Sequence, residues 1–413
     1  MELPQDILMS IFSTLEILDL IRAGSVCNSW RSAYTSICSL GHCKPQQTPC
    51  LLYTFESDST KATGLYSLAE KKAYMLTLLD PALPSRFIIG SSHGWIITAD
   101  ERSELHLVNP ITGKQIALPP VTTIEQVKPI FDDSGAVHNT STHGIQDMTV
   151  SDSPSILAPD ELRNFLFNKA IVSSDPSGGN FIVVLIHNPH LQLSIARSGD
   201  DKWTWLPPHK DYEDCIFRDG LLYALTSEGE IYEYDLSGPA ITRKIVLNKV
   251  KGFTCENMYI VRAPCGDLLQ VWRSYDPLDD EDEDASDDLE ADHDDESYVW
   301  NTTMIKVHKV DLVARMLVEA CDLGENVLIL GHNQSLCLRA DEYPLLKANH
   351  VYLSDDRELY IKGCKNGCRD IGVFNLENNC AEEIVSPQLW SNWPPPVWMT
   401  PNARKISLET HSL

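Results

Sequence analysis

From residue 50 onward the sequence is a long succession of short strand-like segments with almost no helical pattern between them. Segments such as 181–187 (FIVVLIH), 230–235 (EIYEYD) and 351–353 (VYL) are separated by turns rich in Gly, Pro, Asn and Asp. Alternation of polar and apolar residues, as in 230–235, is typical of strands half buried in stacked sheets. The best later helix candidate is the single stretch 159–169. The sequence therefore predicts a body that is essentially all β.

The strands also recur in a loose unit of four strands, each unit about 40–60 residues long. Related units occupy residues 86–119, 212–247, 256–319 and 326–384. Weak repeats of this length and content indicate a β-propeller, because each blade is one four-stranded sheet. Allowing for insertions, about six blades fit the chain. Five or seven blades, or a pair of β-sandwiches, are the alternatives that the pattern leaves open.

The first thirty-odd residues are different, because they are helical and carry more apolar surface than they can bury among themselves. At about 100° per residue, roughly half of the helix circumference is apolar, and it is formed by Leu3, Ile7, Leu8, Ile11, Phe12 and Leu15. A helix with one neighbour needs a stripe only a little wider than 100°. Roughly forty residues seldom fold without disulfides, metal or a partner. We expect another surface to cover the surplus.

The ordered pattern in this segment is Leu3-Pro4-x-Asp6-Ile7-Leu8, Ile11, Leu15, Asp19-Leu20-x-Arg22 and Val26-Cys27-x-x-Trp30-Arg31. It resembles an F-box over about residues 2–40, the three-helix module that docks substrate receptors onto the Skp-family adaptor of cullin–RING ubiquitin ligases. The resemblance implies that the module's core and adaptor face consist of Leu3, Pro4, Ile7, Leu8, Ile11, Leu20, Val26, Cys27 and Trp30. Which of these side chains point inward is not separable from sequence. Asp19 is expected to cap the second helix.

A second resemblance covers nearly the whole chain and rests on the order of several phrases. These are Gly90-Ser91-Ser92-His93-Gly94-Trp95, Asn109-Pro110-x-Thr112-Gly113 with Leu118-Pro119-Pro120, Trp203-Thr204-Trp205, and Trp393-Pro394-Pro395-Pro396-Val397-Trp398. Together they resemble plant F-box proteins that carry a KIB-type β-propeller, formerly a domain of unknown function. This resemblance implies a substrate receptor with the F-box at one end and the propeller as the target-binding body.

Charge and apolar runs limit the partners that the chain can have. The formal net charge of −26 argues against nucleic acid, since a phosphate-binding surface must supply cations. No apolar run approaches the ~18–20 residues of a membrane span, and no secretory signal is recognisable. Twelve scattered cysteines without zinc-ribbon spacing are read as reduced thiols. We expect a nuclear or cytoplasmic protein that binds neither nucleic acid nor membrane.

Two insertions interrupt the strand pattern. Residues 127–158 are rich in Asp, Ser, Thr and Gly and are predicted to form a long, mobile loop. Residues 279–296 contain thirteen acidic residues, half of the net excess, and should be disordered by self-repulsion. The acidic stretch is read as a solvated loop, with steering of a basic partner as the alternative.

Motifs for catalysis and metal binding are weak. Gly90-x-Ser92-x-Gly94 has the spacing of a hydrolase nucleophile elbow, but a strand rather than a helix follows it, so a β-hairpin turn is predicted. The acidic stretch lacks the glycine that a calcium loop needs, since Ala285 stands at that position. No phosphate loop or paired Cys/His spacing occurs. The sequence therefore predicts no catalytic, cofactor-binding or metal-binding residue.

Taken together, the sequence predicts an α+β multidomain chain. Residues 1–42 form a three-helix F-box, and residues 43–413 form an all-β propeller of about six blades. The implied function is the substrate-recognition subunit of an SCF-type E3 ubiquitin ligase, a non-catalytic role with an unknown protein target. A scaffold that binds the adaptor without causing degradation is the alternative. A propeller enzyme is the third hypothesis, and it would need acid, base or metal groups gathered at the central channel.

Overall fold

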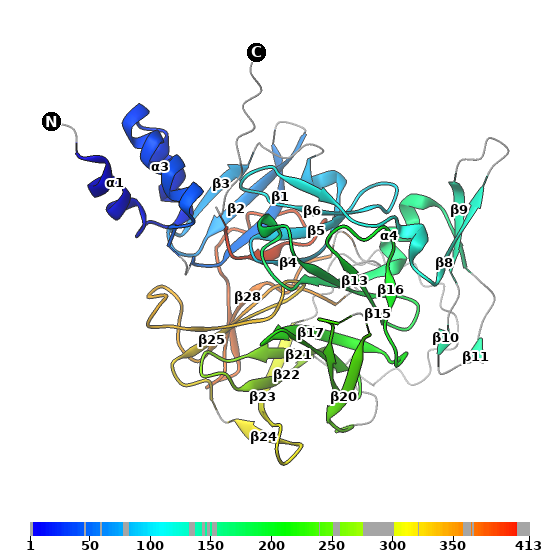
Figure 1. Ribbon diagram of the computed structural model, residues 1–413. Helices are drawn as coiled ribbons and strands as arrows, with labels where there is room; N and C mark the ends of the chain where they lie inside the picture. Colours follow the sequence, from blue (N-terminus) through cyan, green and yellow to red (C-terminus); the bar gives the residue numbers. More distant parts are fainter. Residues whose placement is uncertain are drawn as a thin grey trace.

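A computed structural model shows three N-terminal helices followed by a six-bladed β-propeller (Figure 1). It describes residues 3–44, 47–57, 60–76, 82–131, 137–142, 145–146, 149–150, 155–238, 240–250, 257–275, 301–320, 322–357, 365 and 367–402. The prediction of about six blades is thus confirmed. The acidic stretch 279–296, predicted to be disordered, lies outside the described residues. Within the described residues, no helix is both long and apolar enough to cross a bilayer.

The N-terminal helices are α1 (Gln5–Phe12), α2 (Ile17–Gly24) and α3 (Asn28–Leu40). Helix α3 ends where Gly41 adopts a left-handed conformation with φ 67°, and the amide of His42 then bonds back to the carbonyl of Ile37. The predicted cap of α2 was wrong, because the N-cap residue is Glu16 and Asp19 lies inside the first turn. There its carboxylate still faces the positive end of the helix dipole.

Four blades have the regular form in which consecutive strands pair antiparallel. Blade 2 consists of β4 (Phe87–Ser92), β5 (Trp95–Ala99), β6 (Leu105–Val108) and β7 (Gln115–Ala117). Blade 3 consists of β13 (Phe167–Val172), β14 (Ile182–His187), β15 (Gln192–Arg197) and β16 (Thr204–Trp205). Blade 4 consists of β17 (Tyr212–Arg218), β18 (Leu221–Thr226), β19 (Ile231–Asp235) and β20 (Thr242–Leu247). Blade 5 consists of β21 (Asn257–Arg262), β22 (Leu268–Tyr275), β23 (Thr302–Asp311) and β24 (Met316–Ala320).

Blade 1 closes the ring because it combines strands from both ends of the propeller. Its strands are β1 (Cys50–Ser57), β2 (Thr60–Ser67), β3 (Lys72–Leu76) and β30 (Val397–Met399), the last strand in the described residues. Strand β30 pairs antiparallel with β1, so that Trp398 lies opposite Leu51. Trp398, in the Trp-Pro-rich phrase of the sequence, is fully buried.

Blade 6 departs from the regular pattern. It contains β25 (Asn326–Leu330), β26 (Leu336–Arg339), β27 (His350–Leu353), β28 (Gly372–Asn375) and β29 (Cys380–Glu382), in the order β26-β25-β27-β28-β29. Strands β25 and β27 run parallel, because the chain passes through β26 between them. The extra strand β26 contacts β21 of blade 5. The sequence repeat did not reveal this insertion.

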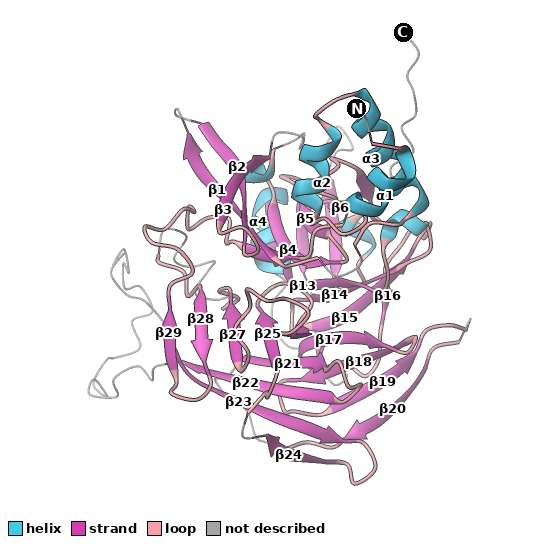
Figure 2. Ribbon diagram, turned by 90° about the vertical axis from the view of Figure 1, so that its left-hand side faces the viewer, coloured by secondary structure: helices cyan, strands magenta, loops and turns pink. Residues whose placement is uncertain are grey.

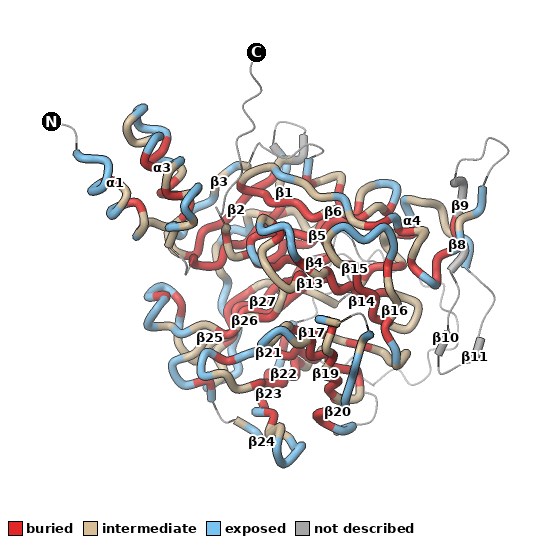
Figure 3. The backbone as a smooth tube through the Cα atoms, viewed as in Figure 1, coloured by how far each residue is buried: buried red, intermediate tan, exposed pale blue. Residues whose placement is uncertain are grey.

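The hydrophobic core is divided into one cluster for each pair of neighbouring blades. Successive residues of a strand point to opposite faces of its sheet, so one strand serves two clusters. In β13, Ala170 and Val172 pack toward blade 2, whereas Ile171 packs toward blade 4. Continuous apolar runs such as that of β14 are therefore strands buried on both faces. Figure 3 shows this buried interior along the inner strands of the ring.

The segment between blades 2 and 3 is more ordered than the sequence indicated. We expected a loop over 127–158, but β8 (Val127–Phe131), β9 (Val137–Thr142) and β12 (Ser155–Leu157) form an antiparallel sheet there. Strands β10 (Ile145–Gln146) and β11 (Thr149–Val150) pair beside it, and α4 (Pro159–Leu166) follows. The buried Val127 joins this sheet to the core, which a composition-based loop prediction does not detect. Figure 1 shows β8 and β9 on the side of the molecule away from α1 and α3.

Three short 3₁₀ helices complete the described structure: η1 (Leu83–Ser85), η2 (Val121–Thr123) and η3 (Pro176–Gly178). The Gly90-x-Ser92-x-Gly94 phrase forms the end of β4 and a tight turn into β5, in which Ser92 pairs with Trp95. The β-hairpin prediction is confirmed, so this serine is not on a nucleophile elbow. Its hydroxyl instead accepts a hydrogen bond from the amide of Val172.

Candidate adaptor-docking surface

Helix α1 divides its apolar residues between two faces. Leu8 and Phe12 are buried against α3, together with Ile37. A neighbouring, outward-facing stripe of α1 is formed by Ile7 and Ile11, which are 44% and 46% exposed, and Leu3, which precedes the helix, is 48% exposed. Ile7 and Ile11 are spaced by four, so they align along one side of α1, and Leu3 is exposed just before the helix begins at Gln5. The surplus apolar surface predicted from the sequence is therefore real and lies on the exposed side of α1 and just before its start.

The start of α3 adds to the exposed surface. Val26 is 63% exposed, and Cys27 next to it is also exposed. The ring of Trp30 packs edge-on against Phe12, with the centroids 5.3 Å apart, and the side chain is only partly buried. Trp30 therefore supports the helical core and reaches the surface at once. A substitution there would disturb the fold of the module as well as any contact outside it.

The structure thus separates the nine residues that the sequence could only group. Leu8 and Leu20 are core residues. Trp30 is intermediate, and the exposed members are Leu3, Pro4, Ile7, Ile11, Val26 and Cys27. We define these six exposed residues as the docking surface. Nothing in the described residues lies over it.

Close packing between α2 and α3 explains a glycine in the middle of the module. A Cβ atom added to Gly24 would lie 2.7 Å from Cγ of Tyr34. Glycine costs about 1 kcal/mol in a helix relative to alanine. Here the absence of a Cβ atom at Gly24, at this cost in helix stability, allows the ring of Tyr34 to lie directly on the α2 backbone.

Helix α2 belongs to the propeller as much as to the helical module. Ile17 is buried in the cluster between blades 1 and 2, beside Leu52 and Leu65. Its amide donates a 2.7 Å hydrogen bond to Oε1 of Gln47. Figure 2 shows the three helices gathered beside the strands of the first two blades. The helical module and the ring are therefore fused through a shared core.

Polar contacts hold the same junction on its outer side. The guanidinium of Arg22 donates a 2.9 Å hydrogen bond to Oε2 of Glu70, which lies in the turn between β2 and β3. The same guanidinium lies over the ring of Tyr74 on β3. Burial opposes ionisation of Glu70, but the hydrogen bonds from Tyr74 and Arg22 outweigh it and lower the pKa of Glu70. Glu16 adds an ion pair with Lys44 at 2.5 Å. The docking surface is thus held in a fixed orientation relative to the propeller.

The centre of the ring contains a buried ion pair that sequence reasoning missed. Nζ of Lys169 on β13 lies 2.9 Å from Oδ1 of Asp214 on β17, and both side chains are buried. Oδ2 of Asp214 accepts hydrogen bonds from the hydroxyl of Ser335 at 2.8 Å and the amide of Ile260 at 3.1 Å. Nζ of Lys169 also donates to the carbonyl of Gly331 at 3.1 Å. Blades 3, 4, 5 and 6 meet through this one pair.

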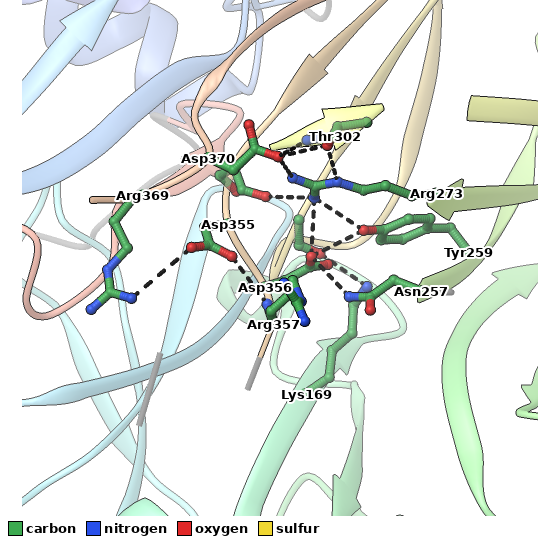
Figure 4. Close-up of polar contacts among 12 residues, drawn as sticks. Lys169, Asn257, Tyr259, Arg273, Thr302, Asp355, Asp356, Arg357, Arg369 and Asp370 are labelled. Atoms are coloured by element: carbon green, nitrogen blue, oxygen red, sulfur yellow. Dashed lines mark hydrogen bonds and ion pairs between the residues drawn. The ribbon is translucent and has the colours of Figure 1, made fainter. Parts of the chain in front are cut away.

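A second buried network lies between blades 5 and 6 (Figure 4). Arg273 of β22 is fully buried and pairs with Asp356 at 3.1 Å and Asp370 at 2.9 Å. Its Nε donates to Thr302 at 2.8 Å. Nearby, burial raises the pKa of Asp355 to about 6, although Arg273 acts in the opposite direction.

These buried charges bear on the enzyme hypothesis, which required acid and base groups at the ring centre. Such groups are present, contrary to what we could assemble from the sequence. Lys169, Asp214 and Arg273 are, however, already bonded to neighbouring protein groups. In the described part of the chain, no three His, Cys, Asp or Glu side chains are placed to hold a metal ion. The arrangement joins blades through satisfied polar contacts, which is a structural role.

Comparison with known protein families agrees with this division of the chain. The family profile described as "KIB1-4 beta-propeller" matches residues 65–375. The profile described as "F-box-like" matches residues 1–40, which contain α1, α2 and α3. The chain belongs to the KIB1-4 beta-propeller family. It is therefore an F-box protein with a β-propeller, as both resemblances implied.

Relatives of this F-box–propeller protein occur in Arabidopsis thaliana. It is 24% identical to the F-box protein SKIP23 over 97% of this chain and 96% of that protein. It is also 24% identical to the F-box protein KIB4, over 56% of this chain and 58% of that protein. The alignment with SKIP23 spans both the helices and the ring, so the two parts occur together in that relative as well.

Proposed function

We propose that this F-box–propeller protein is the substrate-recognition subunit of an SCF-type E3 ubiquitin ligase. In this proposal the docking surface binds a Skp-family adaptor, and through it a cullin–RING ligase, while the propeller binds a target protein. The observation that carries the proposal is the exposed apolar surface of Leu3, Ile7 and Ile11. Contiguous exposed apolar surface marks an interaction site, and here it lies on a module matched by the F-box-like profile.

The proposed mechanism is positioning, without a catalytic residue in this chain. A target held by the propeller would have its lysines at high effective concentration near the ubiquitin-charged enzyme brought by the cullin. The fused junction at Ile17 and Arg22 favours such a role. A rigid connection limits the volume that the target can explore, and so keeps its lysines within reach.

The adaptor interaction is tested by Ile7→Asp in the full chain, measured by calorimetric titration with purified Skp-family adaptor. Ile7 is exposed, so the substitution leaves the buried core intact. A charge in the middle of an apolar interface should weaken binding by about 2 kcal/mol or more, roughly thirtyfold. Ile156→Asp is the matched control, because Ile156 is also exposed but lies on β12. Equal affinity of the two variants would refute the proposed docking surface.

Degradation is tested separately from docking, because an adaptor-binding scaffold is the second candidate function. Proteins co-purified under proteasome inhibition are compared between the intact chain and Ile7→Asp. Deleting residues 1–42 is the poorer experiment, since it would remove Ile17 from the propeller core. A ligase receptor should have partners that bind both forms and live longer in cells expressing only the variant. Partners with unchanged lifetimes would favour the scaffold.

The cellular location belongs to the same proposal. We propose the nucleus or the cytosol, where cullin–RING ligases act. Fluorescence microscopy of the tagged full chain tests this directly, and a secreted or membrane-enclosed protein would contradict it.

A further inference from the structure

A cavity of about 410 Å³ lies where the F-box segment, the closing strand and blade 6 meet. Its walls include Lys44 and Gln47 after α3, the β4–β5 turn, and residues 399–402 at the end of the closing strand. Pockets for small ligands typically measure about 300–1,000 Å³ and occur preferentially between domains. The cavity therefore has the size and the place of a ligand site. The adaptor-docking surface does not include any of these residues.

One wall of the cavity is apolar. Leu336 and Leu338 of β26 pack against the hydrophobic cluster between blades 1 and 6, but they are only partly buried. Tyr343 and Ile17 also line the cavity and are themselves buried in the blade cores. An apolar ring or short chain placed here would remove the two leucines from water. Apolar burial of this kind contributes roughly 25 cal/mol per Å².

The lining also contains polar groups on backbone that is held by hydrogen bonds. His93 stands at the tip of the β4–β5 turn with φ 53°, and Gln334 of blade 6 also lines the cavity. The turn is fixed by Asn402, whose Nδ2 donates to the carbonyl of His93 at 2.9 Å. The amide of Gln334 is likewise held by the carbonyl of Ser91 at 2.8 Å. The polar side chains are therefore presented by backbone that is already in place.

The charged groups Lys44 and Asp175 in the described lining already have polar partners. Nζ of Lys44 pairs with Glu16 at 2.5 Å. Oδ1 of Asp175 accepts from Trp95 Nε1 at 3.2 Å, and its Oδ2 accepts from Asn402 Nδ2 at 2.9 Å. Desolvation lowers the pKa of His93, although Asp175 acts in the opposite direction. A charged ligand would lose its hydration and would find Lys44 already paired and both Asp175 oxygens already hydrogen-bonded.

From this geometry we propose that the cavity binds a small, uncharged, amphipathic molecule. Its apolar ring or chain lies on Leu336 and Leu338, and its hydroxyl or carbonyl group faces His93 and Gln334. Such a ligand touches the F-box segment, the closing strand and blade 6 at once. Its binding therefore stabilises both the closure of the ring and the attachment of the F-box. This proposal does not depend on adaptor binding.

The test uses three probes of the same shape and different charge on the full chain. These are 2-naphthylmethanol, 2-naphthoate and 2-naphthylmethylamine, titrated at pH 7 and followed by naphthyl fluorescence. The neutral alcohol should bind at least about tenfold more tightly than the anion or the cation. Equal binding of all three probes would overturn the proposal, because it would indicate non-specific adsorption.

Two pairs of variants locate the binding. Leu338→Trp fills the cavity and should lower the affinity for the alcohol at least about tenfold. Val318→Trp, on the exposed face of β24, should leave that affinity unchanged. His93→Gly suits the left-handed backbone and should also weaken the alcohol. His190→Gly is its control, since His190 has φ 65° in the β14–β15 turn. Unchanged affinity in both Leu338→Trp and His93→Gly would refute the site. Near-ultraviolet circular dichroism confirms that each variant is folded.

Discussion

Replacing Lys169 by Met tests whether the ion pair at the ring centre holds the blades together. The substitution removes the cation 2.9 Å from Asp214 but keeps the length and apolar stem of the side chain. Asp214 would keep its bonds from Ser335 and Ile260, yet its charge would be buried without a counter-ion. Breaking one side of a buried ion pair costs about 3–5 kcal/mol. The carbonyl of Gly331 also loses its donor, so we expect a value near the upper end.

A loss of this size is large against the 5–15 kcal/mol by which domains are typically stable. The assay is urea unfolding followed by tryptophan fluorescence, with Lys309→Met as the matched control. Lys309 pairs with Asp267 at 2.7 Å, but both side chains are half exposed. An exposed pair contributes about 0–1 kcal/mol. If both variants lose the same stability, the pair at the ring centre does not hold the blades together.

A second variant separates the missing cation from the missing side chain. Lys169→Met combined with Asp214→Asn removes both charges, while the asparagine oxygen still accepts from the Ile260 amide. We expect this double variant to recover a substantial part of the loss, because an uncharged amide is far less costly to bury. No recovery would mean that packing, rather than charge, accounts for the effect of Lys169→Met.

Three further predictions concern single positions. Burial, then the carboxylates of Asp356 and Asp214, raise the pKa of Glu213 to about 7, so the folded state holds this proton more tightly than the unfolded chain. The contribution of this proton to stability is complete below the unfolded pKa near 4.5 and is lost as pH rises through about 7. Glu213→Gln should therefore flatten a profile of unfolding free energy measured from pH 4 to 8. An unchanged profile would contradict this. Gly24→Ala should cost about 1–3 kcal/mol by crowding Tyr34, whereas Gly178→Ala, with open space around it, should be neutral in the same denaturation assay. Ile17→Ala should cost about 2–5 kcal/mol and speed amide exchange in both α2 and β1; faster exchange in α2 alone would refute the shared core.

The strands and the three helices could be predicted from sequence because their signals are local. Alternation in Glu230–Asp235 and turn residues between segments identify blades, and the repeat identifies the ring. The division of α1 could not be predicted, because Ile7 and Leu8 are both apolar and only the position of α3 decides which is buried. In 127–158, polar composition concealed a sheet whose pairing depends on the core contact of Val127.

The ring centre could not be predicted for a different reason. Lys169, Asp214, Ser335 and Gly331 lie on blades 3, 4 and 6, and no spacing along the chain relates them. They meet only because the closed ring brings the inner strands together. A single Lys or Asp in an apolar strand was the available signal, and it indicates a buried partner without identifying it.

The pairing of β1 with β30 has a consequence for the way this protein is made. The partner of the first strand is synthesised about 350 residues later, near the end of the chain. At 5–20 residues per second the ribosome needs about 20–70 s to cover that distance. During this time β1 has an open edge that can pair with the wrong strand. Closure of the ring therefore waits for β30, and a premature stop before Val397 would leave an unclosed polypeptide for chaperones and proteases to clear.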